Sequence, residues 1–359
     1  MEFAVLDDRA TEIARSDREL EDKCFAFDEL LRCELDYAVA AWATHDPATG
    51  LFTSCTLSGI PKDVQREAQV FRHEFTDGEP ATVPSLISSG GTVTVLSDVT
   101  GGDLMSASRY REVFAPFGVS DELRAVLWSE GQAWGSLSVY RQDGTTFGQQ
   151  EAELVTRLAP VFGDGLRLTL LRQAATTPEA VDEPPGIVQV RPDGSVDPLT
   201  DPADRWLELA GDRLVTTANA TAAAVRNRRD WDGATARLAL DDGSVLVLNA
   251  SSTTADDGTV AVIVDRARRA QIGSMLVDAY GLTPRQREVL GLLLLGRSMI
   301  EIARSLDISE HTANDHRKAI YRRIGVSSRS ELAALLQSEH YEPRSHRGVP
   351  PSPYGGFLE

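Results

Sequence analysis

The stretch 281–340 reads GLTPRQREVLGLLLLGRSMIEIARSLDISEHTANDHRKAIYRRIGVSSRSELAALLQSEH and decides the fold of its part of the chain. Thr283 precedes a proline and stands three residues before Gln286, which is the pattern of a capping box with proline at the first helical position. Ser298 and Glu301 repeat this capping box shortly afterwards. The stretch therefore predicts several short helices that begin at defined residues.

Two further helix starts complete the pattern. Ser309 is placed to cap a third helix that ends at Gly325, and Ser328 is placed to cap a fourth. Only Asp307 and Ile308 separate the second helix from the third, as in a helix-turn-helix. We therefore expect an all-α four-helix helix-turn-helix domain over 281–340.

The third helix has two unlike faces when its residues are placed at about 100° per residue. One face is mainly apolar and is expected to pack; it comprises Ala313, His316, Ile320 and Ile324. The other face is polar and net positive; it comprises His311, Asn314, Asp315, Lys318 and Arg322. A DNA major groove admits a helix of this kind, and these side chains include hydrogen-bond donors and acceptors that suit base edges.

Four strings resemble a known family: LTPRQREVL, GRSMIEIARSL, ISEHTANDHRKAI and GVSSRSEL. Over its full length, the segment 281–340 resembles the DNA-binding domain of LuxR-type (NarL/FixJ) transcriptional regulators. Bacterial sigma factors are similar over the first three helices, whereas the run 325–332 is typical of LuxR-type proteins.

The resemblance implies roles for individual side chains of the third helix. Three of them would face bases: Asn314, Asp315 and Lys318. Four others would approach phosphates: Thr312, Arg317, Arg322 and Arg323. The chain also departs from the family. Ala313 stands where valine is usual, and Met299 and Ile300 replace a polar pair, which removes one phosphate contact. Asp315 either accepts a hydrogen bond from cytosine N4 or repels phosphates.

Charge is divided unevenly along the chain. The 359 residues contain 54 Asp and Glu against 36 Lys and Arg, a net charge of −18. Segment 281–340 holds nine Lys or Arg and seven Asp or Glu, a net of +2, and residues 1–280 carry −20. Because one module of net +2 neutralises few phosphates, we expect it to bind DNA as a pair.

The acidic part predicts α+β structure. Residues 17–43 have helical apolar spacing, so we expect one long amphipathic helix there. Residues 122–141 predict two strands joined at 130–132, and 149–172 predicts a helix. After the proline-rich 174–186, strand patterns with D-G turns flank a helical pattern over 201–229.

These patterns define the expected multidomain organisation. Scattered residues of the first α+β region resemble the GAF-like sensory region of large LuxR-type regulators, and the second resembles the PAS-like unit that follows it. The expected limits are a GAF-like domain over 1–173, a linker over 174–186, a PAS-like domain over 187–266, a connecting helix over 267–280, the helix-turn-helix domain over 281–340 and a disordered tail over 341–359.

GAF and PAS units often hold a small molecule between sheet and helices. Tyr110, Trp128 and Trp134 are the residues we predict to line such a ligand pocket. The alternative is that these aromatic side chains only fill the core, which the sequence favours for each of them.

Other kinds of site are disfavoured. Cys24, Cys33 and Cys55 form no C-x-x-C pair, and the string H-E-F-T-D from His73 lacks the second histidine of a zinc protease, so no metal site is expected. No G-x-x-x-x-G-K-[ST] string, catalytic constellation or resident cofactor motif is evident. The sequence contains no apolar run that could span a membrane and no secretory leader, which indicates a cytosolic protein.

The sequence thus predicts a cytosolic, non-enzymatic transcriptional regulator in which an acidic sensory and dimerisation region controls a helix-turn-helix domain. Its expected partners are double-stranded DNA, a second copy of the chain and a small-molecule effector, with RNA polymerase a further candidate. The alternatives left open are a sigma-like promoter-recognition factor, which needs core RNA polymerase to bind, and an enzyme that uses the helices for protein docking.

Overall fold

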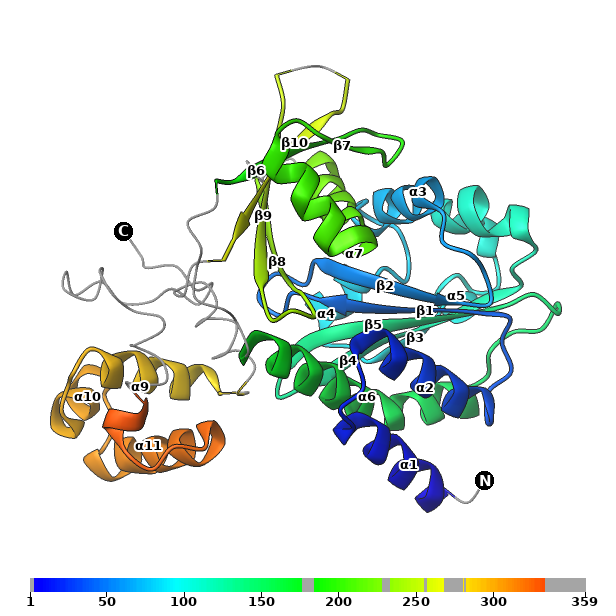
Figure 1. Ribbon diagram of the computed structural model, residues 1–359. Coiled ribbons are helices and arrows are strands. Elements are labelled where there is room, and N and C mark those ends of the chain that lie inside the picture. The colour runs from blue at the N-terminus through cyan, green and yellow to red at the C-terminus, as the bar shows by residue number, and fades with distance from the viewer. Residues whose placement is uncertain are drawn as a thin grey trace. The chain divides into compact units, whose positions relative to one another are not determined.

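The computed structural model describes residues 3–175, 184–227, 233–254, 257–267, 280 and 282–332. The chain divides into two compact units, of which the larger comprises Met1–Ser129 and Ala133–Arg266 and the smaller holds the helix-turn-helix segment (Figure 1). Within the larger unit, we call residues 3–175 the first lobe and residues 184–266 the second lobe. Most of the predicted linker and connecting helix, and all of the predicted tail, lie outside the described residues.

The first lobe contains a five-stranded sheet in the order β2-β1-β5-β4-β3. Its strands are β1 (Val39–His45), β2 (Phe52–Ser58), β3 (Val93–Val95), β4 (Asp121–Ser129) and β5 (Gln132–Arg141). Strand β1 pairs antiparallel with both β2 and β5, and Ala41 lies opposite Ser138. The predicted strands over 122–141 are confirmed, and Glu130 and Gly131 between them have the positive φ angles of a tight turn.

Helices cover both faces of this sheet. One face carries α1 (Phe3–Arg15), α2 (Leu20–Arg32) and α6 (Gln149–Ala175), and the other carries α3 (Val64–Glu74) (Figure 1). Further short helices are α4 (Val83–Ser89), α5 (Leu96–Val99), η1 (Leu104–Ser106), η2 (Tyr110–Phe114) and η3 (Ala115–Phe117). Trp42 of β1 anchors the first face, because its ring lies 5.2 Å from that of Phe162 and 5.9 Å from that of Phe27. The helix predicted over 149–172 is confirmed as part of α6.

The long helix predicted over 17–43 is wrong in its second half. Helix α2 ends at Arg32, and Val39–His45 forms β1, which lies between β2 and β5 in the sheet. Leu35 lies after the end of the helix and is 2 % exposed. It fits the apolar spacing because it is buried in the core, although it is not part of the helix. Strand pairing on both sides of β1 satisfies its backbone groups, and this long-range contribution outweighs the local helical spacing.

The second lobe repeats the strand order of the first. The order of its sheet is β7-β6-β10-β9-β8. If the strands of each lobe are numbered from one to five along the chain, both sheets have the order 2-1-5-4-3. The elements are β6 (Gly186–Val190), β7 (Val196–Pro198), α7 (Asp201–Asn227), β8 (Ala234–Ala239), β9 (Val245–Ser252) and β10 (Val260–Arg266). Helix α7 is interrupted at Gly211, which has φ 50° and ψ −133°.

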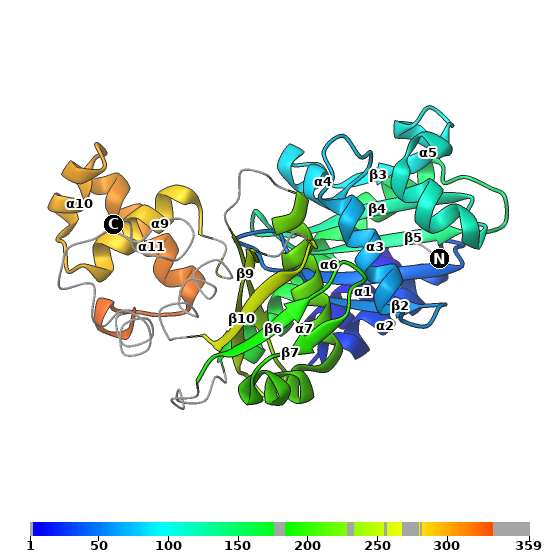
Figure 2. The same cartoon turned by 90° about the horizontal axis from the view of Figure 1, so that it is seen from above.

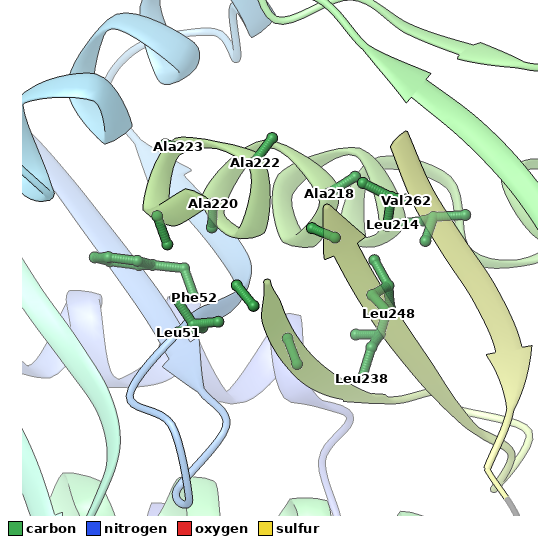
Figure 3. Packing of buried hydrophobic residues seen from close by; sticks show 14 of the residues in the cluster. Leu51, Phe52, Leu214, Ala218, Ala220, Ala222, Ala223, Leu238, Leu248 and Val262 are labelled. Atoms are coloured by element: carbon green, nitrogen blue, oxygen red, sulfur yellow. The ribbon is translucent and has the colours of Figure 1, made fainter. Parts of the chain in front are cut away.

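The two lobes share one hydrophobic core. Helix α7 contacts the second sheet and also β2 and α3 of the first lobe (Figures 1 and 2). All residues from Thr216 to Val225 are buried, and most are alanine or threonine, which lets strands and helices approach closely on all sides. Figure 3 shows alanines of α7 gathered with side chains of both lobes: Leu51, Phe52, Leu238, Leu248 and Val262.

Polar contacts also join the lobes. The Asp46 carboxylate accepts hydrogen bonds from the backbone N–H of Arg237 at 2.9 Å and from its Nη2 at 2.6 Å. Gly194, in the predicted D-G turn, has φ +89°, and a Cβ atom there would lie 2.5 Å from Cβ of Ala68 in α3. Thr217 Oγ1 donates to the Thr53 carbonyl of β2 at 3.0 Å. The first 266 residues therefore contain two sheets but one compact unit.

The smaller unit contains α9 (Pro284–Leu294), α10 (Met299–Ser305) and α11 (Glu310–Ile324). Both predicted capping boxes are confirmed, with the Thr283 and Ser298 side chains each accepting from the backbone N–H three residues later. Residues 329–332 form the start of the predicted fourth helix, and the Glu331 N–H donates to Ser328 Oγ at 3.1 Å. The rest of that helix lies outside the described residues.

Candidate nucleic-acid interface and ligand cavity

Helix α11 is fixed at both ends and along one face. Ser309 Oγ accepts from the Thr312 N–H at 3.0 Å, and Gly325 ends the helix with φ +80°. Ala313, Ile320 and Ile324 are buried in the core formed with α9 and α10. The packed face predicted from the helical wheel is confirmed for these three residues, whereas His316 is half-buried. The register of α11 is therefore set by its core contacts.

The three residues expected to face bases lie on the outer side of α11. Asp315 and Lys318 are exposed, with Lys318 Nζ 3.8 Å and His311 Nε2 3.4 Å from the Asp315 carboxylate. Asn314 is half-buried, and its Nδ2 donates to the Glu310 carbonyl at 3.0 Å. These exposed helix contacts contribute roughly 0.5 kcal/mol or less, so they can open when a base competes for the same groups.

The four residues expected to approach phosphates differ in their surroundings. Arg322 and Arg323 are exposed near the end of α11. Arg317 is half-buried with its guanidinium 5.8 Å from the centroid of the Tyr321 ring. Thr312 Oγ1 lies 2.8 Å from Ser309 Oγ, so its hydroxyl also takes part in the helix cap.

The two unusual apolar residues of α10, Met299 and Ile300, differ in burial. Met299 is half-buried against the module's core, where it replaces polar contact with packing. Ile300 is 56 % exposed, so its side chain remains available at the start of α10.

A cavity of about 130 Å³ lies in the larger unit, on the α3 face of the first sheet. Its wall is mainly apolar and comes from β1, β2, β5, α3 and η2, with Val39, Ala41, Phe52, Phe71 and Phe114 among its residues. Such residues carry no local motif, because they come from segments far apart in the chain. Sequence reasoning therefore missed this wall.

The predicted pocket residues Tyr110, Trp128 and Trp134 are not among those that line the cavity. Each instead satisfies its polar atom within the fold. Tyr110 Oη donates to the Val119 carbonyl at 2.8 Å, Trp128 Nε1 to the Gly91 carbonyl at 2.8 Å, and Trp134 Nε1 to the Ser129 carbonyl at 3.2 Å. Trp134 is buried, whereas Tyr110 and Trp128 are half-buried. A ligand pocket at these three residues stays a prediction.

A buried ionic cluster closes one side of the cavity. Glu74 and Glu122 form ion pairs with Arg109 and Arg124 at 2.6–2.7 Å, and all four side chains are 3 % exposed or less. Although burial opposes it, the positive charges of Arg124 and Arg109 hold the pKa of Glu74 below its usual range. Glu74 is therefore an ionised group that its arginine partners hold in place.

Glu67 of α3 also lines the cavity but is paired less completely. Its Oε1 accepts from Thr216 Oγ1 of α7 at 2.9 Å and lies 3.9 Å from Lys62 Nζ. Its Oε2 is buried and has no hydrogen-bond partner among the described residues. Burial raises the pKa of this carboxyl group, and it raises that of the Cys55 thiol in the same wall to about 12.

The H-E-F-T-D string has structural partners. His73 Nε2 lies 3.1 Å from Glu112 Oε2, and Glu74 belongs to the ionic cluster. Within the described ranges, no group of three or more His, Cys, Asp or Glu residues is arranged to hold a metal ion. No helix of those ranges is long and apolar enough to cross a membrane.

The caps, the short turn and the two-faced third helix define the smaller unit as a helix-turn-helix module. Residues 281–336 match the family described as "Bacterial regulatory proteins, luxR family". The C-terminal module is therefore a LuxR-family helix-turn-helix domain.

Curated relatives match in the same region. The transcriptional regulatory protein MctR of Rhizobium johnstonii is 45 % identical over 51 residues, which are 14 % of this chain and 24 % of that protein. The nitrate/nitrite response regulator protein NarL of Escherichia coli is 39 % identical over 62 residues, which are 17 % of this chain and 29 % of that protein. The chain thus spans less than a third of the length of these relatives.

Solved structures are similar to part of the chain. The GAF domain/HD domain protein from Geobacter sulfurreducens is 16 % identical, covers 48 % of this chain and 99 % of its own, and superposes with a TM-score of 0.31.

Proposed function

We propose that this chain is a DNA-binding transcriptional regulator in which α11 reads operator DNA in the major groove. The observation that carries the proposal is the two-sided geometry of α11 within a LuxR-family module. Its apolar face is held against α9 and α10, and its opposite face exposes the acceptor of Asp315 and the donor of Lys318. Such a helix can be inserted into a groove without unfolding its own core.

Within this proposal, three side chains contact bases: Asn314, Asp315 and Lys318. Four others contact phosphates: Thr312, Arg317, Arg322 and Arg323. Lys318 and Asn314 exchange their helix contacts for base contacts. Asp315 restricts which bases can bind, because an ionised carboxylate accepts hydrogen bonds and cannot donate them.

The functional form is proposed to be a homodimer. A module with a net charge of +2 gains few phosphate contacts, and two modules on half-sites about 34–36 Å apart would double them. The acidic remainder of the chain, at −20 over residues 1–280, is expected to be repelled by the duplex. We propose that segments 271–280 and 330–336 are helical and provide the coupling between the domains and the dimer surface. Both segments lie mostly outside the described residues.

The two lobes are proposed to be the sensory part, with a GAF-like region over 1–173 and a PAS-like region over 187–266. What supports this is the cavity on the α3 face, since a concave, mainly apolar space with a few polar groups is typical of small-molecule sites. A regulator of chromosomal DNA would act in the cytoplasm, and RNA polymerase is a further proposed partner.

The test begins with an operator selected in vitro from genomic fragments with the full chain. Fluorescence anisotropy then measures binding to that operator and to unrelated DNA. We expect Asn314→Ala and Lys318→Ala each to cost about 1–3 kcal/mol on the operator only, and Arg322→Ala to weaken binding to both DNAs. Arg18→Ala removes an exposed arginine from the first lobe and serves as the matched control.

Unchanged operator binding in all three α11 variants would refute the proposed interface. Binding that occurs only when core RNA polymerase is added would instead support a sigma-like factor. A regulator of the proposed kind binds its operator without polymerase.

A further inference from the structure

Glu67 lines the cavity, and one of its carboxylate oxygens is a buried acceptor that the described part of the fold does not use. Glu67 Oε2 lies in a carboxylate whose side chain is 10 % exposed, and it has no hydrogen-bond partner among the described residues. Leaving a buried acceptor unsatisfied costs about 1–3 kcal/mol, so a group that supplies a donor there gains that amount. The atom therefore defines where a ligand's polar group would bind.

The other charged groups of the wall are already engaged. Glu74 and Arg124 pair with each other in the buried ionic cluster. Asp63 Oδ1 accepts from the Arg66 N–H at the start of α3, and the Arg66 guanidinium lies 4.5 Å from the centroid of the Phe117 ring. Glu67 thus differs from these residues, because its Oε2 has no hydrogen-bond partner among the described residues.

The size of the space limits the ligand. The cavity measures about 130 Å³, and apolar cavities of roughly 150 Å³ accept benzene. Side chains such as Val39, Ala41 and Phe52 offer it no charge, so most of the ligand has to be apolar. A single aromatic ring or a short branched chain fits these dimensions.

The polar group of the ligand follows from the surroundings of Glu67. Lys62 Nζ lies 3.9 Å from Oε1 and already supplies a positive charge, so a second buried cation would meet repulsion and lose its hydration. A hydroxyl group is neutral and both donates and accepts, which suits the carboxyl group whether it is ionised or protonated.

We propose that the cavity binds a small, mainly apolar alcohol or phenol whose hydroxyl group hydrogen-bonds to Glu67 Oε2. The same carboxyl group accepts from Thr216 of α7 through Oε1, so the ligand is separated from the second lobe by one side chain. A role of this ligand as the regulator's signal rests on the proposed function, whereas its binding does not.

The experiment uses the full chain without DNA and measures binding of three probes by isothermal titration calorimetry. Phenol is compared with toluene, which replaces the hydroxyl by a methyl group, and with benzylamine, which carries a cation. We expect phenol to bind at least tenfold more tightly than either of the other probes. Toluene has no donor for the buried acceptor, and the ammonium group of benzylamine is repelled by Lys62 and loses its hydration.

Three variants locate the site. Glu67→Leu should abolish the preference for phenol over toluene, while Gln65→Leu, an exposed change in the same helix, should leave it intact. Ala41→Leu fills part of the cavity and should weaken phenol at least tenfold. This variant and the wild-type comparison test the proposal even if Glu67→Leu does not fold.

Equal binding of phenol and toluene by the wild type, no binding of phenol at millimolar concentration, or tighter binding of benzylamine would overturn the proposal. A phenol preference that survives in folded Glu67→Leu would do the same. The probe titrations contain no DNA, so their results do not depend on operator binding. A failed ligand prediction can therefore be distinguished from a failed DNA-binding proposal.

Discussion

The Asp46–Arg237 pair offers the sharpest test of the shared core. Asp46 in the first lobe is 1 % exposed at its side chain and Arg237 in the second lobe is 7 % exposed. The carboxylate accepts from Nη2 at 2.6 Å, from Nε at 3.1 Å and from the backbone N–H at 2.9 Å. Asp46→Ala leaves a guanidinium group and a backbone donor buried without this acceptor.

Breaking a buried pair from one side costs about 3–5 kcal/mol, against a total stability of about 5–15 kcal/mol for a domain. We expect Asp46→Ala to lower the free energy of unfolding of both lobes by the same amount, since they share the core around α7. The double variant Asp46→Ala/Arg237→Ala should cost less than the sum of the single changes. Asp17→Ala, which removes the 97 % exposed partner of Arg172, should cost less than about 1 kcal/mol.

Hydrogen exchange in increasing urea, read by mass spectrometry, measures the two lobes separately. Peptides covering β2 report on the first lobe, and peptides covering β9 report on the second. If β9 loses protection in Asp46→Ala while β2 keeps its wild-type opening free energy, the lobes unfold independently and the reasoning is refuted. Simple addition of the two single effects would show that the pair contributes no coupling.

Two further predictions concern pH and helix termination. His45 is 1 % exposed, with Nδ1 donating to the Gly50 carbonyl and Nε2 accepting from Ser136 Oγ, and burial lowers its pKa to about 4. In the unfolded state this histidine binds a proton with a pKa near 6.5, so the free energy of unfolding falls as the pH drops from 6.5 toward 4. The expected loss between pH 7 and pH 5 is about 2 kcal/mol. Urea titrations at both pH values should show this loss for the wild type and not for His45→Gln. Gly296 follows α9 and has φ +83°, a conformation that is strained for alanine. Gly296→Ala should therefore destabilise the helix-turn-helix module by about 1 kcal/mol, which hydrogen exchange of α9 to α11 measures. Ser305→Ala, at an exposed position, is the control. Equal exchange in both variants would contradict a termination role for Gly296.

The helix-turn-helix module was the most predictable part of the chain because its signals are local. A cap such as Ser298 with Glu301 lies within one helical turn, and the structure contains both of its hydrogen bonds. The residues of α11 expected to contact DNA are arranged on one helix, so a wheel already places them. Their contacts with bases and phosphates stay predictions.

Long-range structure was harder to predict. The pattern of residues 17–43 did not reveal that β1 would be paired on both sides. The cavity wall brings together Ala41, Glu67 and Phe114 from three separate segments, and no spacing in the sequence links them. The sequence predicts Trp128 and Trp134 as residues of a pocket wall, whereas in the structure their indole N–H groups donate to nearby carbonyl groups.

The position of α7 between two sheets bears on how mutant alleles of this gene would be interpreted. A truncation or a domain exchange that breaks the chain near 174–186 removes the helix that covers β2, and it exposes apolar surface of the first lobe. Loss of function in such an allele would reflect misfolding of both lobes rather than the absence of one of them. Alleles that cut after residue 266 keep both sheets and lack only the segment that contains the helix-turn-helix module.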